Sequence, residues 1–83
     1  MKKLLYFSAT WCGPCINLSP ILMGICKSNN IPIEKIDVDQ DPENTVKYRI
    51  RSIPTLIVIE NDQEIKRHIG VIEQYKILEF WNN

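Results

Sequence analysis

Two cysteines separated by two residues are the part of this sequence best suited to chemistry. Cys12 and Cys15 flank Gly13 and Pro14, and a helix that begins here would bring positions i and i+3 to one face. A disulfide requires Cα atoms about 4.4–6.8 Å apart, which this spacing allows. A helix N-terminus carries unpaired N–H groups and a partial positive charge, so it favours thiolate over thiol. The pair therefore predicts thiol–disulfide exchange, in which the thiolate is the nucleophile.

The two sulfurs are predicted to have different roles. The helix start acts most strongly on the more N-terminal sulfur, so we expect Cys12 to attack a partner disulfide. Cys15, one turn further in and more covered, would then attack the mixed disulfide and release the reduced partner. Half of a zinc site is the main alternative for a lone Cys-x-x-Cys, but zinc takes four ligands. Only Cys26 and His68 remain as further candidates, so the sequence favours no metal.

The flanking residues predict strands and helices that would position this pair. Apolar or alternating runs predict strands at 3–8, 32–39, 55–59 and 64–69. Apolar residues at helical spacing, with proline at the first position of the first two helices, predict helices at 14–28, 42–48 and 71–81. The order β-α-β-α-β-β-α predicts an α/β fold with a four-stranded mixed sheet and helices on both faces.

Length, charge and cysteine count limit the class of protein. The chain has 83 residues and a formal net charge of zero, which predicts one domain over 1–83 and gives no electrostatic case for nucleic acid or an anionic membrane. No apolar run approaches the ~20 residues of a membrane span, and the apolar stretch near the N-terminus is shorter than the ~7–15 residues of a secretory signal. Three cysteines, an odd number, suit a reducing compartment. We therefore expect a cytoplasmic monomer.

The segment around the cysteine pair resembles the active-site segment of thioredoxins. Residues 11–15 spell the family's Trp-Cys-Gly-Pro-Cys signature, and the similarity extends over essentially the whole chain, through Pro20, segments 37–42 and 48–55, and Gly70. The resemblance implies a thioredoxin-like minimal core and a disulfide reductase that is re-reduced by a thioredoxin reductase. It also implies disulfide-containing protein substrates and no bound cofactor, with reducing equivalents coming from NADPH through a flavoprotein reductase.

The resemblance also assigns roles to the residues around the two sulfurs. It implies a cis peptide bond between Ile53 and Pro54 that faces the cysteines, with the Ile53 backbone pairing with an extended substrate segment. Trp11 would be a flat contact for the partner, and Gly70 would belong to the same substrate-binding surface. Gly13 would leave the turn between the cysteines unobstructed, and Pro14 would limit motion between the sulfurs.

Two departures from the family pattern bear on the expected chemistry. This chain begins at what would be the family's second strand, which implies a core of glutaredoxin size with a thioredoxin active site. Tyr6 stands where thioredoxins bury an aspartate beneath the resolving cysteine, and Lys35 where a lysine neighbours that acid. That aspartate is thought to help take the proton from the resolving thiol. Deprotonation of Cys15 would then rely on water, on Tyr6 or on the departing thiolate, and we expect it to be slower or to have a different pH profile.

Three functions fit these observations. The first is a general disulfide reductase, and the second is a dedicated electron donor for one target such as ribonucleotide reductase. The third is a binding module in which the cysteines are incidental, although the complete signature argues against it. Of the remaining residues, Cys26 is predicted to lie in the core. The acidic residues of segment 37–43 are predicted to terminate a strand and cap a helix rather than to bind calcium.

Overall fold

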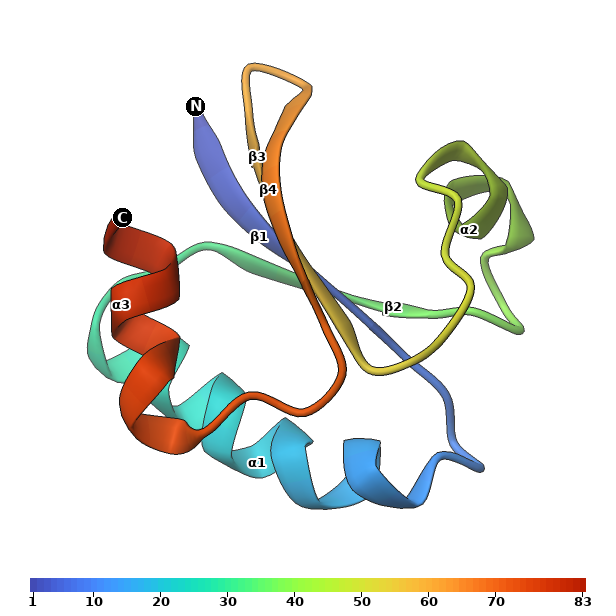
Figure 1. Cartoon of the computed structure of the whole chain (residues 1–83), viewed down its shortest axis with the longest axis horizontal. Coiled ribbons are helices and arrows are strands. Elements are labelled where there is room, and N and C mark those ends of the chain that lie inside the picture. Colours follow the sequence, from blue (N-terminus) through green and yellow to red (C-terminus); the bar gives the residue numbers. More distant parts are fainter.

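The first strand, β1 (Lys2–Ser8), lies inside a four-stranded sheet of order β2-β1-β3-β4 (Figure 1). The computed structural model describes all residues, 1–83. β1 runs parallel to β2 (Ile33–Asp37) and antiparallel to β3 (Thr55–Glu60), and β3 pairs antiparallel with β4 (Gln63–Ile69). The predicted four-stranded mixed sheet is therefore confirmed.

β2 is shorter than the strand predicted at 32–39. It ends at Asp37, whose Oδ1 accepts hydrogen bonds from the backbone N–H groups of Asp39 at 2.8 Å and Gln40 at 3.3 Å. A short acidic side chain that binds the backbone just beyond itself forms a turn in place of further strand. The predicted strand is therefore wrong at its C-terminal end, because the Asp37 side chain competes with the ladder.

The helices follow the predicted order, with one late start. They are α1 (Gly13–Ser28), α2 (Pro42–Lys47), a 3₁₀ turn η1 (Gln74–Lys76) and α3 (Ile77–Asn82), and none of them is long and apolar enough to cross a membrane. The prediction of a helix from residue 71 is wrong. Gly70 has φ of 97° and Glu73 is extended, with φ −64° and ψ 141°. The chain first turns at Gly70 and places Ile72 in the core, so no helix forms before Gln74.

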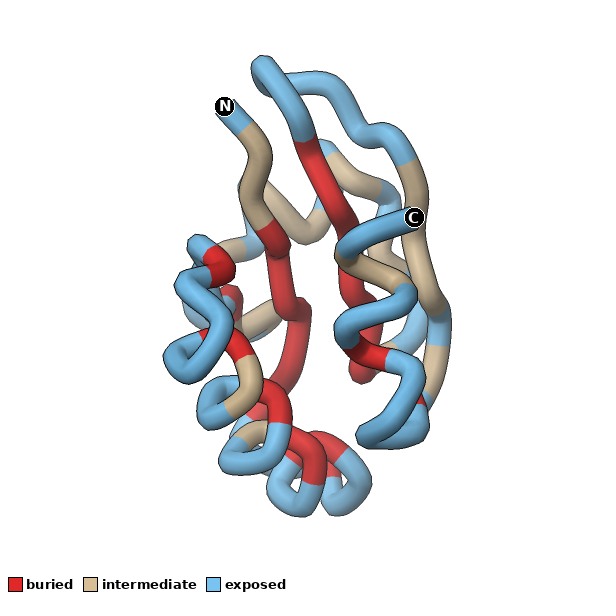
Figure 2. Tube along the Cα trace, turned by 90° about the vertical axis from the view of Figure 1, so that its left-hand side faces the viewer, coloured by how far each residue is buried: buried red, intermediate tan, exposed pale blue.

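Both faces of the sheet contribute buried residues, and the buried parts of the chain are red in Figure 2. One face of β1 and β3 packs with residues of α1 and with Ile77 of α3; the members of this cluster include Leu4, Tyr6, Leu18, Leu22, Cys26, Leu56 and Val58. The opposite face is covered from the segment after α2, which contributes Tyr48, Ile50 and Ile53. The helices thus lie on both faces, as predicted.

Three segments that are distant in sequence meet where β1 ends. The turn after β1 is closed by a hydrogen bond from the Cys12 N–H to the Ala9 carbonyl oxygen at 3.2 Å, and α1 begins immediately after it. Thr55, the first residue of β3, pairs with Phe7 of β1, so the residues just before β3 lie at the same end of the sheet. The segment after β4 is attached there by the Gly70 N–H, which donates to the Pro54 carbonyl oxygen at 2.8 Å. The fold therefore brings the cysteines, Pro54 and Gly70 together.

Candidate active site

Cys12 is the N-cap residue of α1. Its backbone is extended, with φ −87° and ψ 106°, and its Sγ accepts a hydrogen bond from the backbone N–H of Cys15 at 3.2 Å. A cap side chain normally offers oxygen to the unpaired N–H groups of a first turn, and here sulfur takes that place. The first turn of α1 contains no acidic residue. The Cys12 sulfur thus lies at the positive end of a helix with an N–H group directed at it, which favours its thiolate.

Cys12 and Cys15 form a disulfide, with their Cα atoms 5.2 Å apart. Cys12 is 5% exposed and Cys15 is 1% exposed. The predicted pairing of these two residues is thus present in the structure, and Cys12 is the more exposed residue of the two. A Cβ added at Gly13 would meet no atom within 4 Å, so packing within the chain does not require glycine there.

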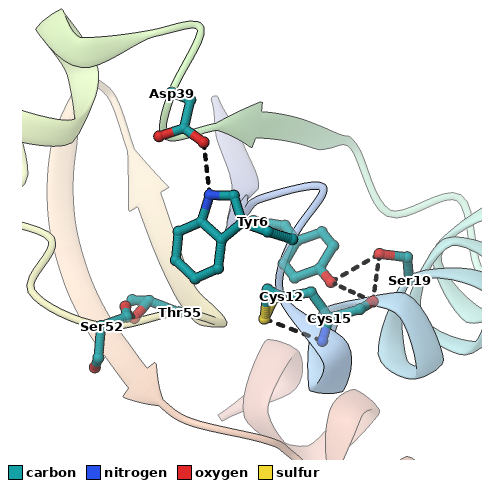
Figure 3. The surroundings of a disulfide bond; sticks show 8 residues. Tyr6, Cys12, Cys15, Ser19, Asp39, Ser52 and Thr55 are labelled. Carbon is teal, nitrogen blue, oxygen red and sulfur yellow. Dashed lines mark hydrogen bonds between the residues drawn. A yellow bond between two sulfur atoms is a disulfide. The ribbon is translucent and has the colours of Figure 1, made fainter.

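The peptide bond between Ile53 and Pro54 is cis, as the resemblance implies. Ile53 packs against the buried cluster of Ala9, Cys12 and Cys15. The turn is supported from below by the Thr55 hydroxyl, which donates to the carbonyl oxygen of Ser52 at 2.8 Å (Figure 3). The loop thus lies against the disulfide in a fixed conformation. This is the arrangement that a β-strand-like contact with a partner segment would need.

Trp11 is 67% exposed, yet its ring is held in place. Its Nε1–H donates at 2.7 Å to Oδ2 of Asp39, which lies two residues after the end of β2. A hollow of about 410 Å³ opens between Trp11 and Ile53, lined also by Ile50 and Arg51. A large exposed aromatic ring beside a hollow is typical of a contact surface for another protein.

Tyr6 lies beneath Cys15 and is fully buried (Figure 3). Its hydroxyl is 2.8 Å from the Ser19 hydroxyl and 3.2 Å from the Cys15 carbonyl oxygen, and Ser19 donates to that carbonyl oxygen at 2.8 Å. Each hydroxyl has one proton, so both short contacts form together when Tyr6 donates to Ser19 and Ser19 donates to Cys15. Burial raises the pKa of Tyr6, and the Ser19 contact offsets only part of that rise. Tyr6 is therefore a protonated donor rather than a base.

Two of the residues that position this site, Asp39 and Ser19, were not assigned from the sequence. Asp39 was expected only to end a strand, but its partner Trp11 is distant in sequence. Ser19 had a local signal, because it lies four residues after Cys15 and so on the same helix face.

Lys35 is exposed and lines a hollow beside Cys15. Cys26 is buried in the core as predicted, and burial raises its pKa.

A four-stranded mixed sheet, a Cys-x-x-Cys disulfide at a helix start and a facing cis-proline define the class of thioredoxin-fold proteins. The sequence model of the family described as Thioredoxin matches residues 1–83, and the chain belongs to this family. A thioredoxin of Mycobacterium tuberculosis is 41% identical over 69 residues, which cover 81% of this chain and 60% of that protein. The chain thus spans about three-fifths of the length of such curated relatives.

Two further relatives add to this assignment. A protein of Mycobacterium leprae named as a bifunctional thioredoxin reductase/thioredoxin is 41% identical over 69 residues, which cover 81% of this chain and 15% of that protein. The X-ray structure of Fasciola hepatica thioredoxin superposes with a TM-score of 0.89 at 32% identity, and the match covers 98% of this chain and 78% of the other. Sequence and fold thus agree on the family.

Proposed function

We propose that this protein is a thiol–disulfide oxidoreductase that reduces disulfides in other proteins. The observation that carries the proposal is the Cys12 sulfur, which accepts the Cys15 N–H at the start of α1 and belongs to a disulfide with Cys15. A thiolate is stabilised at that position. A structural cysteine pair would need neither the helix start nor the facing Ile53–Pro54 loop.

The reaction proceeds in two exchanges. The Cys12 thiolate attacks one sulfur of the partner disulfide, and the other partner sulfur leaves as a thiolate. Cys15, as a thiolate, then attacks Cys12 Sγ; the bond between Cys12 and the partner breaks, and the partner leaves with both thiols. The partner gains two electrons, and the protein ends in the disulfide form.

The partner is expected to bind as an extended segment across Trp11 and the cis-proline loop. Ile53 packs against the cysteine cluster, and its main-chain groups would pair with such a segment. Trp11 provides the flat apolar contact, since Asp39 holds its ring in place. Gly70 belongs to the same surface through its hydrogen bond to Pro54. Binding then aligns the target disulfide with Cys12.

The oxidised protein must be reduced again, and we propose that a flavoprotein thioredoxin reductase does so with electrons from NADPH. The support is the Mycobacterium leprae relative, whose name joins a thioredoxin reductase and a thioredoxin in one protein. No cofactor of its own is needed, because the electrons travel on the cysteine pair. We place the protein in the cytoplasm because a transient disulfide and a free buried Cys26 suit a reducing compartment. We expect it to act as a monomer.

Turnover with thioredoxin reductase and NADPH, measured beside a glutathione-coupled assay, tests the proposal. We expect insulin or a similar protein disulfide to be reduced only when the reductase is present. Cys12→Ser abolishes turnover, whereas Cys26→Ala, a matched cysteine removed from the core, retains it. Turnover in Cys12→Ser would contradict the proposed nucleophile. Activity with glutathione alone would contradict the proposed reductase and place the protein with glutaredoxins.

A further inference from the structure

A hollow of about 360 Å³ lies beside Cys15, between α1, the end of β1 and β2. Its polar lining comes from Ser8 at the end of β1, Ser19 of α1, and Lys35 and Asp37 of β2. A water molecule occupies about 30 Å³ in the liquid and needs a few polar partners. The hollow is therefore large and polar enough to hold water against the resolving cysteine.

The strand register directs Asp37 into this hollow. Tyr6 pairs with Lys35, and Ser8 pairs with Asp37, between the parallel strands β1 and β2. Neighbouring residues of paired strands point to the same face, and Tyr6 packs under α1. Lys35 and Asp37 are thus on the α1 side of the sheet, and Asp37 is the only carboxylate that lines the hollow.

The Asp37 carboxylate is held in place through one of its oxygens. Oδ1 accepts hydrogen bonds from the backbone N–H groups of Asp39 at 2.8 Å and Gln40 at 3.3 Å, and these two contacts fix the orientation of the side chain. Oδ2 makes no hydrogen bond within the chain, so it can accept one from water. The side chain therefore combines a fixed orientation with an unused acceptor atom.

Tyr6, the residue directly beneath Cys15, cannot take the proton of the Cys15 thiol. Its phenol is protonated, and the short contact to Ser19 uses its proton. The other titratable groups that line the hollow are Lys35, a cation, and Cys15 itself. The first turn of α1 has no acidic residue. Asp37 is thus the acceptor that the structure provides.

We propose that Asp37 takes the proton of Cys15, through water in the hollow, when the mixed disulfide is resolved. The inference rests on the proposed function and names the proton acceptor of its second exchange. The Cys15 proton passes to water, and a proton of that water passes to Asp37. The Cys15 sulfur forms its bond to Cys12 Sγ while the bond from Cys12 to the partner breaks. The partner thiolate leaves with the electron pair and takes up a proton from solvent. Asp37 then releases to solvent the proton that it accepted.

Charge alone predicts the opposite result of removing Asp37. A carboxylate near Cys15 opposes formation of a second negative charge on the thiolate, whereas Lys35 favours it. If Asp37 acted only through its charge, Asp37→Asn would therefore speed the resolving step. A proton acceptor predicts that the same substitution slows it. The sign of the effect thus separates the two roles.

The test is stopped-flow reaction of the reduced protein with a limiting amount of an aromatic disulfide that releases a coloured thiolate at each exchange. The first release reports attack by Cys12 and the second reports resolution by Cys15. We expect Asp37→Asn to leave the first rate unchanged and to slow the second about 10- to 100-fold near pH 7, since general base catalysis contributes about 10²–10⁴-fold. The deficit should shrink as the pH rises, because hydroxide then removes the thiol proton without help from Asp37.

Two further variants separate proton transfer from structure. Asn at position 37 retains an oxygen that can accept the two turn hydrogen bonds, whereas Asp37→Ala loses both the turn and the charge. Glu34→Gln is the matched control, because Glu34 is on the same strand but forms an exposed ion pair with Lys3. It should change neither rate. A second rate that is unchanged or faster in Asp37→Asn overturns the inference and leaves the proposed function intact. Absence of the first release in the wild type overturns the proposed function itself.

Discussion

Replacement of Tyr6 by phenylalanine tests whether this buried residue is structural or takes part in proton transfer. The substitution removes one hydroxyl from a side chain that is fully buried in the core and leaves the ring in place. The hydroxyl is 2.8 Å from Ser19, so one good hydrogen bond is lost. Such a bond contributes about 0.5–1.5 kcal/mol to stability.

The structure predicts that the loss of stability in Tyr6→Phe stays within this range. Ser19 still donates to the Cys15 carbonyl oxygen at 2.8 Å, so Tyr6→Phe leaves that acceptor bonded. We therefore expect the free energy of unfolding to fall by about 1 kcal/mol, which lowers the melting temperature by about 4–8 °C in a domain of this size. Urea unfolding of the oxidised protein measures the change. The Tyr6→Phe/Ser19→Ala double variant should lose less than the sum of the two single losses, because the two hydroxyls share one contact.

The same variant reports on catalysis. Because Tyr6 is a protonated donor, Tyr6→Phe should change the rate of the resolving step by less than about 3-fold, against the ~10²-fold or more that loss of a general base costs. The two-step aromatic disulfide reaction measures that rate, and Tyr6→Asp serves as the opposite substitution, which adds a carboxylate at the same place. A resolving step slowed ~10-fold or more in Tyr6→Phe would refute our assignment of Tyr6 and weaken that of Asp37. A stability loss above ~3 kcal/mol would refute the hydrogen-bond reasoning.

Two other perturbations follow from single contacts. Asp39→Ala frees the Trp11 ring, and ordering such a side chain costs about 0.5–1.5 kcal/mol. The KM for a protein disulfide should therefore rise about 2- to 10-fold with kcat unchanged, whereas Asp39→Asn, which keeps an acceptor oxygen, should behave as wild type. Burial raises the pKa of Cys26, so the folded state favours the neutral thiol and the stability of the oxidised protein should decline as pH rises above about 9. Cys26→Ala should remove this decline between about pH 9 and about pH 10; an unchanged slope in unfolding experiments would contradict it.

The parts of the fold that follow local rules could be predicted from the sequence. Pro14 and Pro42 indicate helix starts correctly, because proline fits the first turn of a helix. The order of strands follows from periodicity and from the crossover rule for parallel pairs. The late start of the last helix could not be predicted, since the competing demand is the burial of Ile72 in the core. Tertiary packing outweighs helix propensity there.

The site divides in the same way. Cys12 and Cys15 carry a local signal, their spacing at a helix start. Tyr6 and Lys35 were placed by resemblance, and the structure does position both near Cys15. The role proposed for Asp37 could be inferred only from the structure. One oxygen of its side chain binds the backbone where β2 ends, and the strand register places the side chain on the face of the sheet where the hollow lies. A residue such as Asp37, which has a local role at the end of a strand, carries no sequence signal for a second contact with a distant part of the chain.

The backbone of Cys15 is fixed at both ends, and this determines how the site can move. Its N–H group donates to Cys12 Sγ at 3.2 Å (Figure 3). Its carbonyl oxygen accepts a hydrogen bond from the Ser19 hydroxyl at 2.8 Å, and the Tyr6 hydroxyl lies 3.2 Å from the same oxygen. Displacement of this peptide would break the cap of α1 and expose buried hydroxyls of the core together. We therefore expect the disulfide to open and close by rotation of the two cysteine side chains. Loss of the Cys15 proton, rather than movement of the helix, should therefore set the rate of the second exchange.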